Sequence, residues 1–139
     1  MEITANAIQT VAVNGNVLFT DTLVPGNYSV MHRDGSGLVT LRGLTSQCRA
    51  RFRVSFGGNV AIPTGGTVGP ISLAIAINGE PVATTTMIST PAAVEEFNNV
   101  FSAIFLDIPK GCCSQISVQN IGTEAIEIQN ANLIVERVA

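Results

Sequence analysis

The chain has 139 residues, of which 46% are hydrophobic and 12% are charged, against about 25% charged residues in a typical globular protein. This length fits one domain covering residues 1–139, and the net charge of −3 argues against a nucleic-acid-binding protein, which carries a basic face. No stretch approaches the roughly 20 apolar residues of a membrane span, so we expect no membrane insertion.

Apolar and polar residues alternate with a period of two through most of the chain, which is typical of β-strands with one buried face. Residues 7–22 alternate in this way around Asn14-Gly15-Asn16, which predicts a bulge or tight turn. Residues 28–43 form two short predicted strands around Asp34-Gly35-Ser36-Gly37. This is a hairpin signal, because glycine tolerates positive φ.

A strand predicted over residues 48–56 has two chemically different faces. One face is apolar and carries Ala50, Phe52, Val54 and Phe56. The other face carries Arg49, Arg51, Arg53 and Ser55. Because alternate side chains of a strand point to opposite faces, the apolar set should pack in a core and the arginines should face outward.

The second half of the chain continues the strand pattern. Residues 71–77 and 82–89 flank Asn78-Gly79, a favoured pair for a tight hairpin turn, and the first arm is apolar enough to be buried on both faces. Later strands are predicted over residues 97–109, 114–120 and 125–138. About nine or ten short strands separated by turns favour an all-β sandwich or jelly roll.

Three motifs carry a family resemblance that covers most of the chain from Val68 onward. They are "VGPISLAIAINGEPV" from Val68, "IFLDIPKG" from Ile104 and "ISVQNIGTEAIEIQNANLIVERV" from Ile116. The chain resembles the trimeric jelly rolls of the tumour necrosis factor and complement-head type. More closely, it is similar to the bacterial and bacteriophage versions on exosporium glycoproteins and collagen-like surface proteins.

The resemblance implies a homotrimer in which the first and last strands lie side by side, close to the threefold axis. Self-association is also expected from the low share of charged residues, because a monomer would expose a large uncharged surface. The resemblance further implies binding or architecture rather than catalysis. Since no collagen-like Gly-X-Y repeat occurs, a free-standing trimer on a virion or other particle fits better than a stalked surface fibre.

Two functional hypotheses follow. The first is a non-enzymatic structural or adhesive trimer that acts by multivalent display, such as a phage decoration protein, a fibre head or a bacterial surface module. Its partners would be further copies of itself and a virion component, a cell-surface component or a glycan. The alternative is a small-molecule or carbohydrate-binding β-sandwich, which a single tyrosine and the lack of tryptophan weaken. We expect no cofactor and no enzymatic activity.

Arg49, Arg51 and Arg53 form the most distinctive polar feature of the sequence. Their guanidinium groups would lie roughly 7 Å apart along one strand face. Such a row can hold carboxylates or phosphates of a ligand through paired hydrogen bonds. Alternatively, it pairs with acidic side chains of neighbouring strands or of another subunit, for which the candidates are Asp107, Glu124, Glu127 and Glu136.

The three cysteines leave two structural states open. Cys112 and Cys113 are adjacent, so on an extended backbone their sulfur atoms point to opposite faces and cannot easily bind one metal ion. We therefore expect no metal site, because zinc normally needs four ligands. Cys48 either forms a disulfide with one of the pair, near one end of the sandwich, or all three thiols stay reduced and mostly buried.

His32 is the only histidine, and it lies at the mouth of the first predicted hairpin. Without a recognisable nucleophile partner it does not indicate a catalytic site. It is either a solvent-exposed turn residue or part of a ligand site, and the loops 32–37 and 64–70 are the loops in which we expect recognition. The opening "MEITANAIQT" lacks the pattern of a secretory signal. We expect synthesis in the cytoplasm and a final place on a virion, outside the cell or on its surface.

Overall fold

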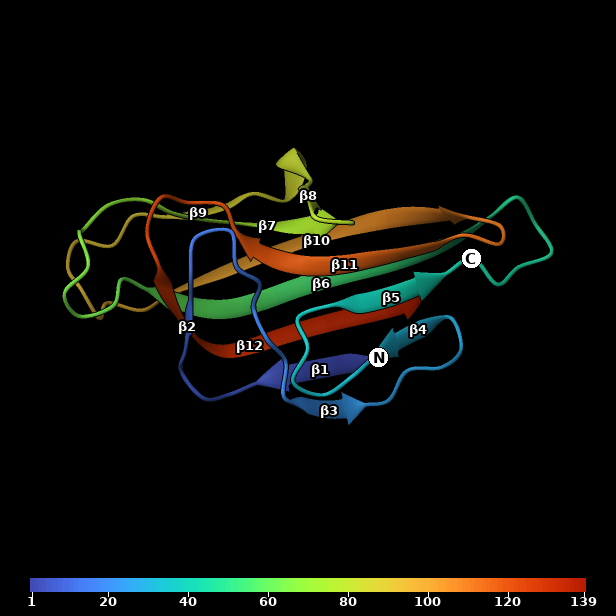
Figure 1. Cartoon of the computed structure of the whole chain (residues 1–139), viewed down its shortest axis with the longest axis horizontal. Coiled ribbons are helices and arrows are strands. Elements are labelled where there is room, and N and C mark those ends of the chain that lie inside the picture. The colour runs from blue at the N-terminus through green and yellow to red at the C-terminus, as the bar shows by residue number, and fades with distance from the viewer.

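A computed structural model describes residues 1–139 as two antiparallel sheets of six strands each, packed face to face (Figure 1). Sheet A contains β1 (Glu2–Ala5), β2 (Gln9–Val11), β3 (Asp21–Val24), β6 (Arg49–Ala61), β10 (Asn98–Pro109) and β12 (Ile126–Arg137). Sheet B contains β4 (Val30–His32), β5 (Val39–Arg42), β7 (Ile71–Ile77), β8 (Glu80–Pro81), β9 (Met87–Ser89) and β11 (Cys113–Asn120). The predicted jelly-roll sandwich is confirmed, with twelve strands rather than nine or ten.

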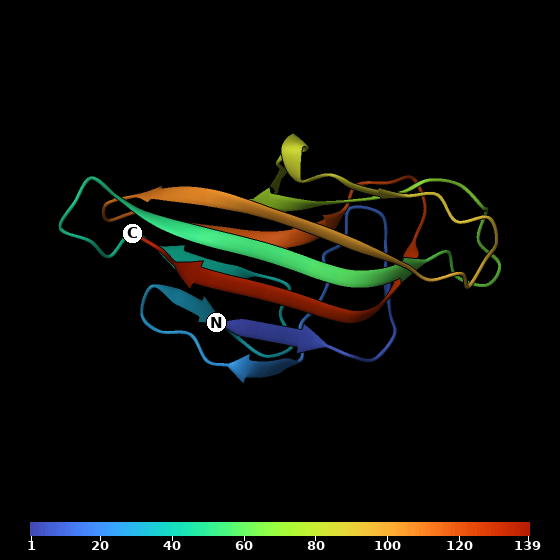
Figure 2. The same cartoon turned by 180° about the vertical axis from the view of Figure 1, so that it is seen from behind.

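Sheet A has the order β10-β6-β12-β1-β3, and its strands lie across the front in Figure 2. The first and last strands of the chain are neighbours, since Glu2 pairs with Ile134 and Ala5 with Ala131. The long terminal strand β12 therefore lies inside the sheet between β6 and β1. This position leaves neither of its edges open to pairing with another chain.

The core lies between the two sheets, where 28 buried apolar residues form one cluster. The predicted inner face of β6 is confirmed, because Ala50, Phe52, Val54 and Phe56 are completely buried. The ring of Phe56 meets Phe19 edge to face, with 6.3 Å between their centroids and 77° between their planes. Phe19 thereby anchors the segment between β2 and β3 to the inner face of β6.

The N-terminal region differs from the prediction in its strands. Asn14 does form a turn, with a φ of 63° and a hydrogen bond from Gly15 N to Ala12 O. However, the segment that contains Val17 and Phe19, which we expected to continue the strand, is not a strand. It lies between β2 and β3. Val17 and Phe19 are nevertheless buried, because they fill the core from an extended segment in which Val17 N donates to Val118 O at 2.9 Å and Phe19 N donates to Ser36 O at 3.3 Å.

The hairpin at Asn78-Gly79 is present, but its second arm is interrupted. β8 has only two residues, a 3-10 turn over Ala83–Thr85 follows, and β9 then pairs with the start of β7. The hydroxyl of Thr85 supplies the hydrogen-bond acceptor that a neighbouring strand would otherwise provide, since Ile75 N donates to Thr85 Oγ1 at 2.9 Å. This turn, the one helical segment of the structure, is too short to cross a membrane.

We predict that Phe56→Ala lowers the free energy of unfolding by about 3–5 kcal/mol, since it leaves a cavity at a fully buried site. Urea unfolding followed by circular dichroism measures this change. The matched control is Ile88→Ala, because the Ile88 side chain is 66% exposed and its loss should change stability by under about 0.5 kcal/mol. Equal effects of the two substitutions would contradict this assignment of the core.

Candidate functional site

The outer face of sheet A exposes large apolar side chains to the solvent. Phe101 and Phe105 of β10 are 63% and 61% exposed, and Ile134 of the nearby strand β12 is 39% exposed. Phe101 stands opposite Gly57 of β6, and a methyl group on that glycine would lie 3.6 Å from the Phe101 ring. The ring therefore extends over the glycine as part of a continuous patch. We call Phe101, Ala103, Phe105 and Ile134 the outer apolar face.

The three arginines of β6 lie on this same side of sheet A and contact acidic side chains of both neighbouring strands. Arg51 donates from Nε to Asp107 Oδ1 at 2.8 Å and from Nη2 to Asp107 Oδ2 at 3.1 Å. Arg49 Nε lies 3.1 Å from Asp107 Oδ2, and Arg53 Nη1 lies 3.6 Å from Glu136 Oε1. Two of the four carboxylates expected to pair with the arginine row do so, while ligand binding by this row stays a prediction.

The ion pair also affects protonation. The hydrogen bond from Arg51 lowers the pKa of Asp107, and the positive charges of Arg51 and Arg49 act in the same direction. In return, the hydrogen bond to Asp107 raises the pKa of Arg51. Both side chains are about 40% exposed, at 42% and 38%, so water screens the pair and its effect on stability is small.

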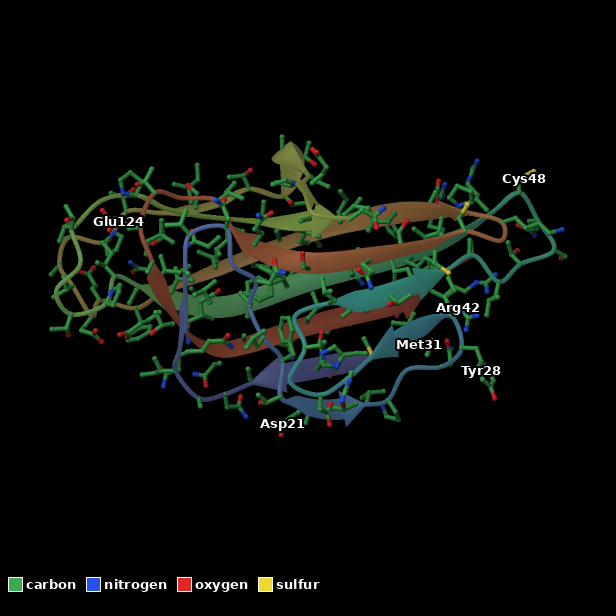
Figure 3. The ribbon with its side chains drawn as sticks, viewed as in Figure 1. Asp21, Tyr28, Met31, Arg42, Cys48 and Glu124 are labelled. Atoms are coloured by element: carbon green, nitrogen blue, oxygen red, sulfur yellow. The ribbon has the colours of Figure 1, made fainter.

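All three cysteines are exposed free thiols, so the expectation of mostly buried cysteines is wrong. They are exposed because Cys48 and Cys112 lie in loops and Cys113 is the first residue of β11, at the end of sheet B. The loop of Cys48 contacts the β10–β11 turn, where Lys110 N donates to Cys48 O at 2.9 Å and Gly43 N donates to Cys112 O at 2.8 Å. The expected neighbourhood at one end of the sandwich is confirmed, and Figure 3 shows Cys48 projecting there, far from Glu124. A disulfide of Cys48 stays a prediction.

The opposite end of the sandwich holds a pair of acidic side chains. Glu95 has a φ of 60°, and its Oε1 accepts hydrogen bonds from Thr64 N at 2.9 Å and Thr64 Oγ1 at 3.1 Å. Partial burial raises the pKa of Glu127, and the nearby carboxyl group of Glu95 raises it further. Residues 67–70 of the loop 64–70, in which the sequence predicts recognition, line a small cavity of about 140 Å³ at this end together with Thr123 and Glu124.

A larger groove lies where the edges of the two sheets meet, between β3 of sheet A and β4 of sheet B. Its volume is about 660 Å³, and its walls include Thr22, Pro25, Tyr28, Met31, His32 and Asp34. We call it the edge groove. Figure 3 shows Tyr28 pointing outward from the loop between β3 and β4, with Met31 beside it on β4. Tyr28 is 81% exposed and Met31 is 48% exposed, so both present apolar surface to the solvent.

His32 differs from the expected solvent-exposed turn residue, because its side chain is only 1% exposed. The ring packs edge to face on Phe19, with centroids 6.4 Å apart, which draws it into the core. Its Nε2 donates to Ser36 O at 2.8 Å, so in the neutral ring Nδ1 carries a lone pair. This Nδ1 is buried without a hydrogen-bond partner, and Asp34 Oδ1 lies 3.9 Å away.

The sequence reasoning found His32 but missed its neighbours in the edge groove. Tyr28, Met31 and Asp34 lie in or beside the predicted hairpin, and only the register of β4 and the approach of β3 bring them to one groove. It also missed Phe101 and Phe105, although the period-two pattern of residues 97–109 places both on one face. No group of three or more histidine, cysteine or acidic side chains is arranged to hold a metal ion.

Comparisons with known proteins identify the fold. No protein-family model matches the sequence, and no curated protein is similar to it. Solved structures do match. The globular domain of the zebrafish complement 1qA protein superposes with a TM-score of 0.62 at 12% identity, over 96% of this chain and 93% of that chain.

Two tumour-necrosis-factor-type proteins match in the same way. Eiger TNF from S. frugiperda has a TM-score of 0.66 at 11% identity, over 100% of this chain and 92% of that chain. Murine APRIL has a TM-score of 0.65 at 10% identity, over 97% of each chain. The chain has the jelly-roll fold of these head domains. At such low identity the likeness concerns the fold alone.

We predict that Asp107→Asn slightly lowers stability at neutral pH. The folded-state pKa of Asp107 is lowered, so its contribution is complete above the usual aspartate pKa of about 4 and is lost as pH falls through the lowered value. Urea midpoints measured between about pH 7 and pH 3 should therefore converge for the variant and the wild type. The control Glu136→Gln removes only the longer contact to Arg53 and should have a smaller effect.

Glu127→Gln should have the opposite sign. The folded-state pKa of Glu127 is raised, so wild-type stability is favoured at low pH and declines as pH rises through that pKa. The variant carries no charge there and should be slightly more stable than the wild type at about pH 7, with the difference vanishing below the usual glutamate pKa of about 4.3. A variant less stable than the wild type at neutral pH would show that Glu127 makes favourable contacts as an anion.

Proposed function

We propose that this chain is a non-enzymatic structural or adhesive module that works as a homotrimer. The observation that carries the proposal is the outer apolar face, where two phenylalanines are more than 60% exposed on a chain with only 12% charged residues. Contiguous exposed apolar surface of this kind is typical of interaction sites. The occupant that we propose for it is a second copy of the same chain.

The charges beside the outer apolar face favour this occupant. Asp107 pairs with Arg51 and also contacts Arg49, and Arg53 contacts Glu136, all within one chain, so two carboxylates balance two of the three arginines. Burying the apolar face against another copy therefore leaves one unbalanced positive charge, which Arg49 can keep in water because its side chain is 60% exposed and lies at the end of the row. Apolar area removed from water would then stabilise the assembly by roughly 25 cal/mol per Å².

The number three comes from the family resemblance of the motifs after Val68 together with the matching fold. The adjacent strands β1 and β12 agree with the strand arrangement that the resemblance implies near a threefold axis. The same resemblance supports a bacterial or bacteriophage setting, such as a virion decoration protein, a fibre head or a surface module. Function would rest on multivalent display, in which three identical sites bind weakly one by one and strongly together.

Native mass tests this proposal most directly. We predict a mass of three chains by light scattering on a sizing column, unchanged by reductant. Phe101→Asp should reduce the mass to one chain, because it places a charge in the outer apolar face. The control Ile88→Asp alters an exposed apolar residue of sheet B and should leave the mass unchanged.

Other masses would carry different meanings. A wild-type monomer with and without reductant would contradict the trimer and favour the alternative, a carbohydrate-binding or small-molecule-binding sandwich that acts as a single chain. A fall from three chains to one on reduction would assign the assembly to the exposed cysteines rather than to the outer apolar face.

A further inference from the structure

We infer that the edge groove is a binding site for a neutral pyranose sugar at the end or along the side of a glycan. This inference rests on the proposed function, since it names what the displayed sites of the module would bind. The groove has a volume of about 660 Å³, within the range of about 300–1,000 Å³ for ligand sites. It combines an exposed aromatic face with side chains that accept hydrogen bonds.

Tyr28 provides the aromatic face from a turn with a fixed shape. Asn27 Oδ1 accepts a hydrogen bond from Ser29 N at 2.8 Å, and Val30 N donates to Asn27 O at 3.3 Å. A methyl group on Gly26 would lie 2.1 Å from Val30 O, so only glycine permits this close approach of the backbone. The turn holds Tyr28 in the solvent with 81% of its surface exposed. A rigid tyrosine offers large contact area at low entropic cost, and the C–H face of a pyranose is a flat apolar partner for it.

Asp34 provides an exposed acceptor at the wall of the groove, with the buried ring of His32 behind it. Thr22 Oγ1 donates to Asp34 Oδ1 at 2.7 Å, which orients the carboxylate and leaves Oδ2 free for a ligand. His32 Nδ1 lies 3.9 Å from Oδ1 and is a buried acceptor without a partner. A buried polar atom without a hydrogen bond is unfavourable, so a donor that reaches Nδ1 is favoured. A sugar hydroxyl can donate to the exposed carboxylate of Asp34, whereas Nδ1 is covered by protein and is reached only if the wall of the groove shifts.

The charges of the groove favour a neutral ligand over an ionic one. Asp34 is the only acidic side chain that lines it, no lysine or arginine does, and the ammonium group of Met1 already donates to Val135 O at 2.7 Å, so an anionic ligand would meet repulsion from Asp34. An organic ammonium ion would meet a single carboxylate whose side chain is 62% exposed. Ion pairs that are this exposed to solvent contribute little to binding free energy. A sugar uses both the aromatic face and the acceptors without needing a charge partner.

The test is an NMR titration of the ¹⁵N-labelled chain with methyl α-glucopyranoside, methyl α-galactopyranoside and methyl α-mannopyranoside in turn. At least one sugar should shift the amide signals of Tyr28, Met31, His32 and Asp34, with the millimolar Kd expected for a ligand of this size. Tyr28→Ala and Asp34→Asn should each weaken binding about tenfold. Ile88→Ala, which alters an exposed side chain elsewhere, should leave the Kd unchanged.

Several results would overturn the inference: no shifts with any of the three sugars, shifts confined to residues outside the groove, or an unchanged Kd in Tyr28→Ala. Tyr28→Ala removes an exposed side chain, so an unaltered urea midpoint would show that lost binding is not lost folding. Saturable shifts with n-butylammonium but with no sugar would also overturn it and assign the groove to organic cations. A three-chain mass without sugar shifts rejects only this inference, whereas sugar shifts on a monomer reject only the trimer.

Discussion

The inner face of β6 is the interaction on which the other features of this protein depend. Phe52, Val54 and Phe56 are completely buried between the two sheets, and β6 joins β10 on one side to β12 on the other. Because successive side chains of a strand point to opposite faces, this burial leaves the arginines no position except the outer face. The packing of the core therefore determines the placement of the ion pairs as well.

The outer face of sheet A has two chemically distinct parts along the same strands. Toward the cysteine end, arginines of β6 are paired with Asp107 and Glu136. Further along, Ser55 and Gly57 replace the arginines, and Phe101 lies opposite Gly57, while Phe105 lies opposite Arg53 at the boundary between the two parts. Small residues in β6 thus allow an apolar patch next to a row of ion pairs, a combination suited to contact with another copy of the chain.

The edge groove depends on the meeting of two sheets rather than on any single element. β3 ends sheet A and β4 ends sheet B, and the turn between them crosses from one to the other. Thr22 on β3 reaches Asp34 beyond β4, twelve residues later in the chain. Since β10 forms the opposite border of sheet A, the groove and the exposed phenylalanines of β10 lie on separate borders, so one molecule has room for self-association and for ligand binding.

The sequence by itself determined the jelly-roll class, the buried face of β6, the doubly buried strand β7 and the turns at Asn14 and Asn78, because alternation and turn chemistry act over a few neighbouring residues. Only the tertiary structure decided which strands are neighbours and in which register. That register pairs Arg51 with Asp107 across 56 residues, lets Thr85 interrupt the second arm of the hairpin, and draws His32 onto Phe19. A period of two specifies which face of the sheet a side chain occupies, but it does not specify which strand is the neighbour or in which register the two strands pair.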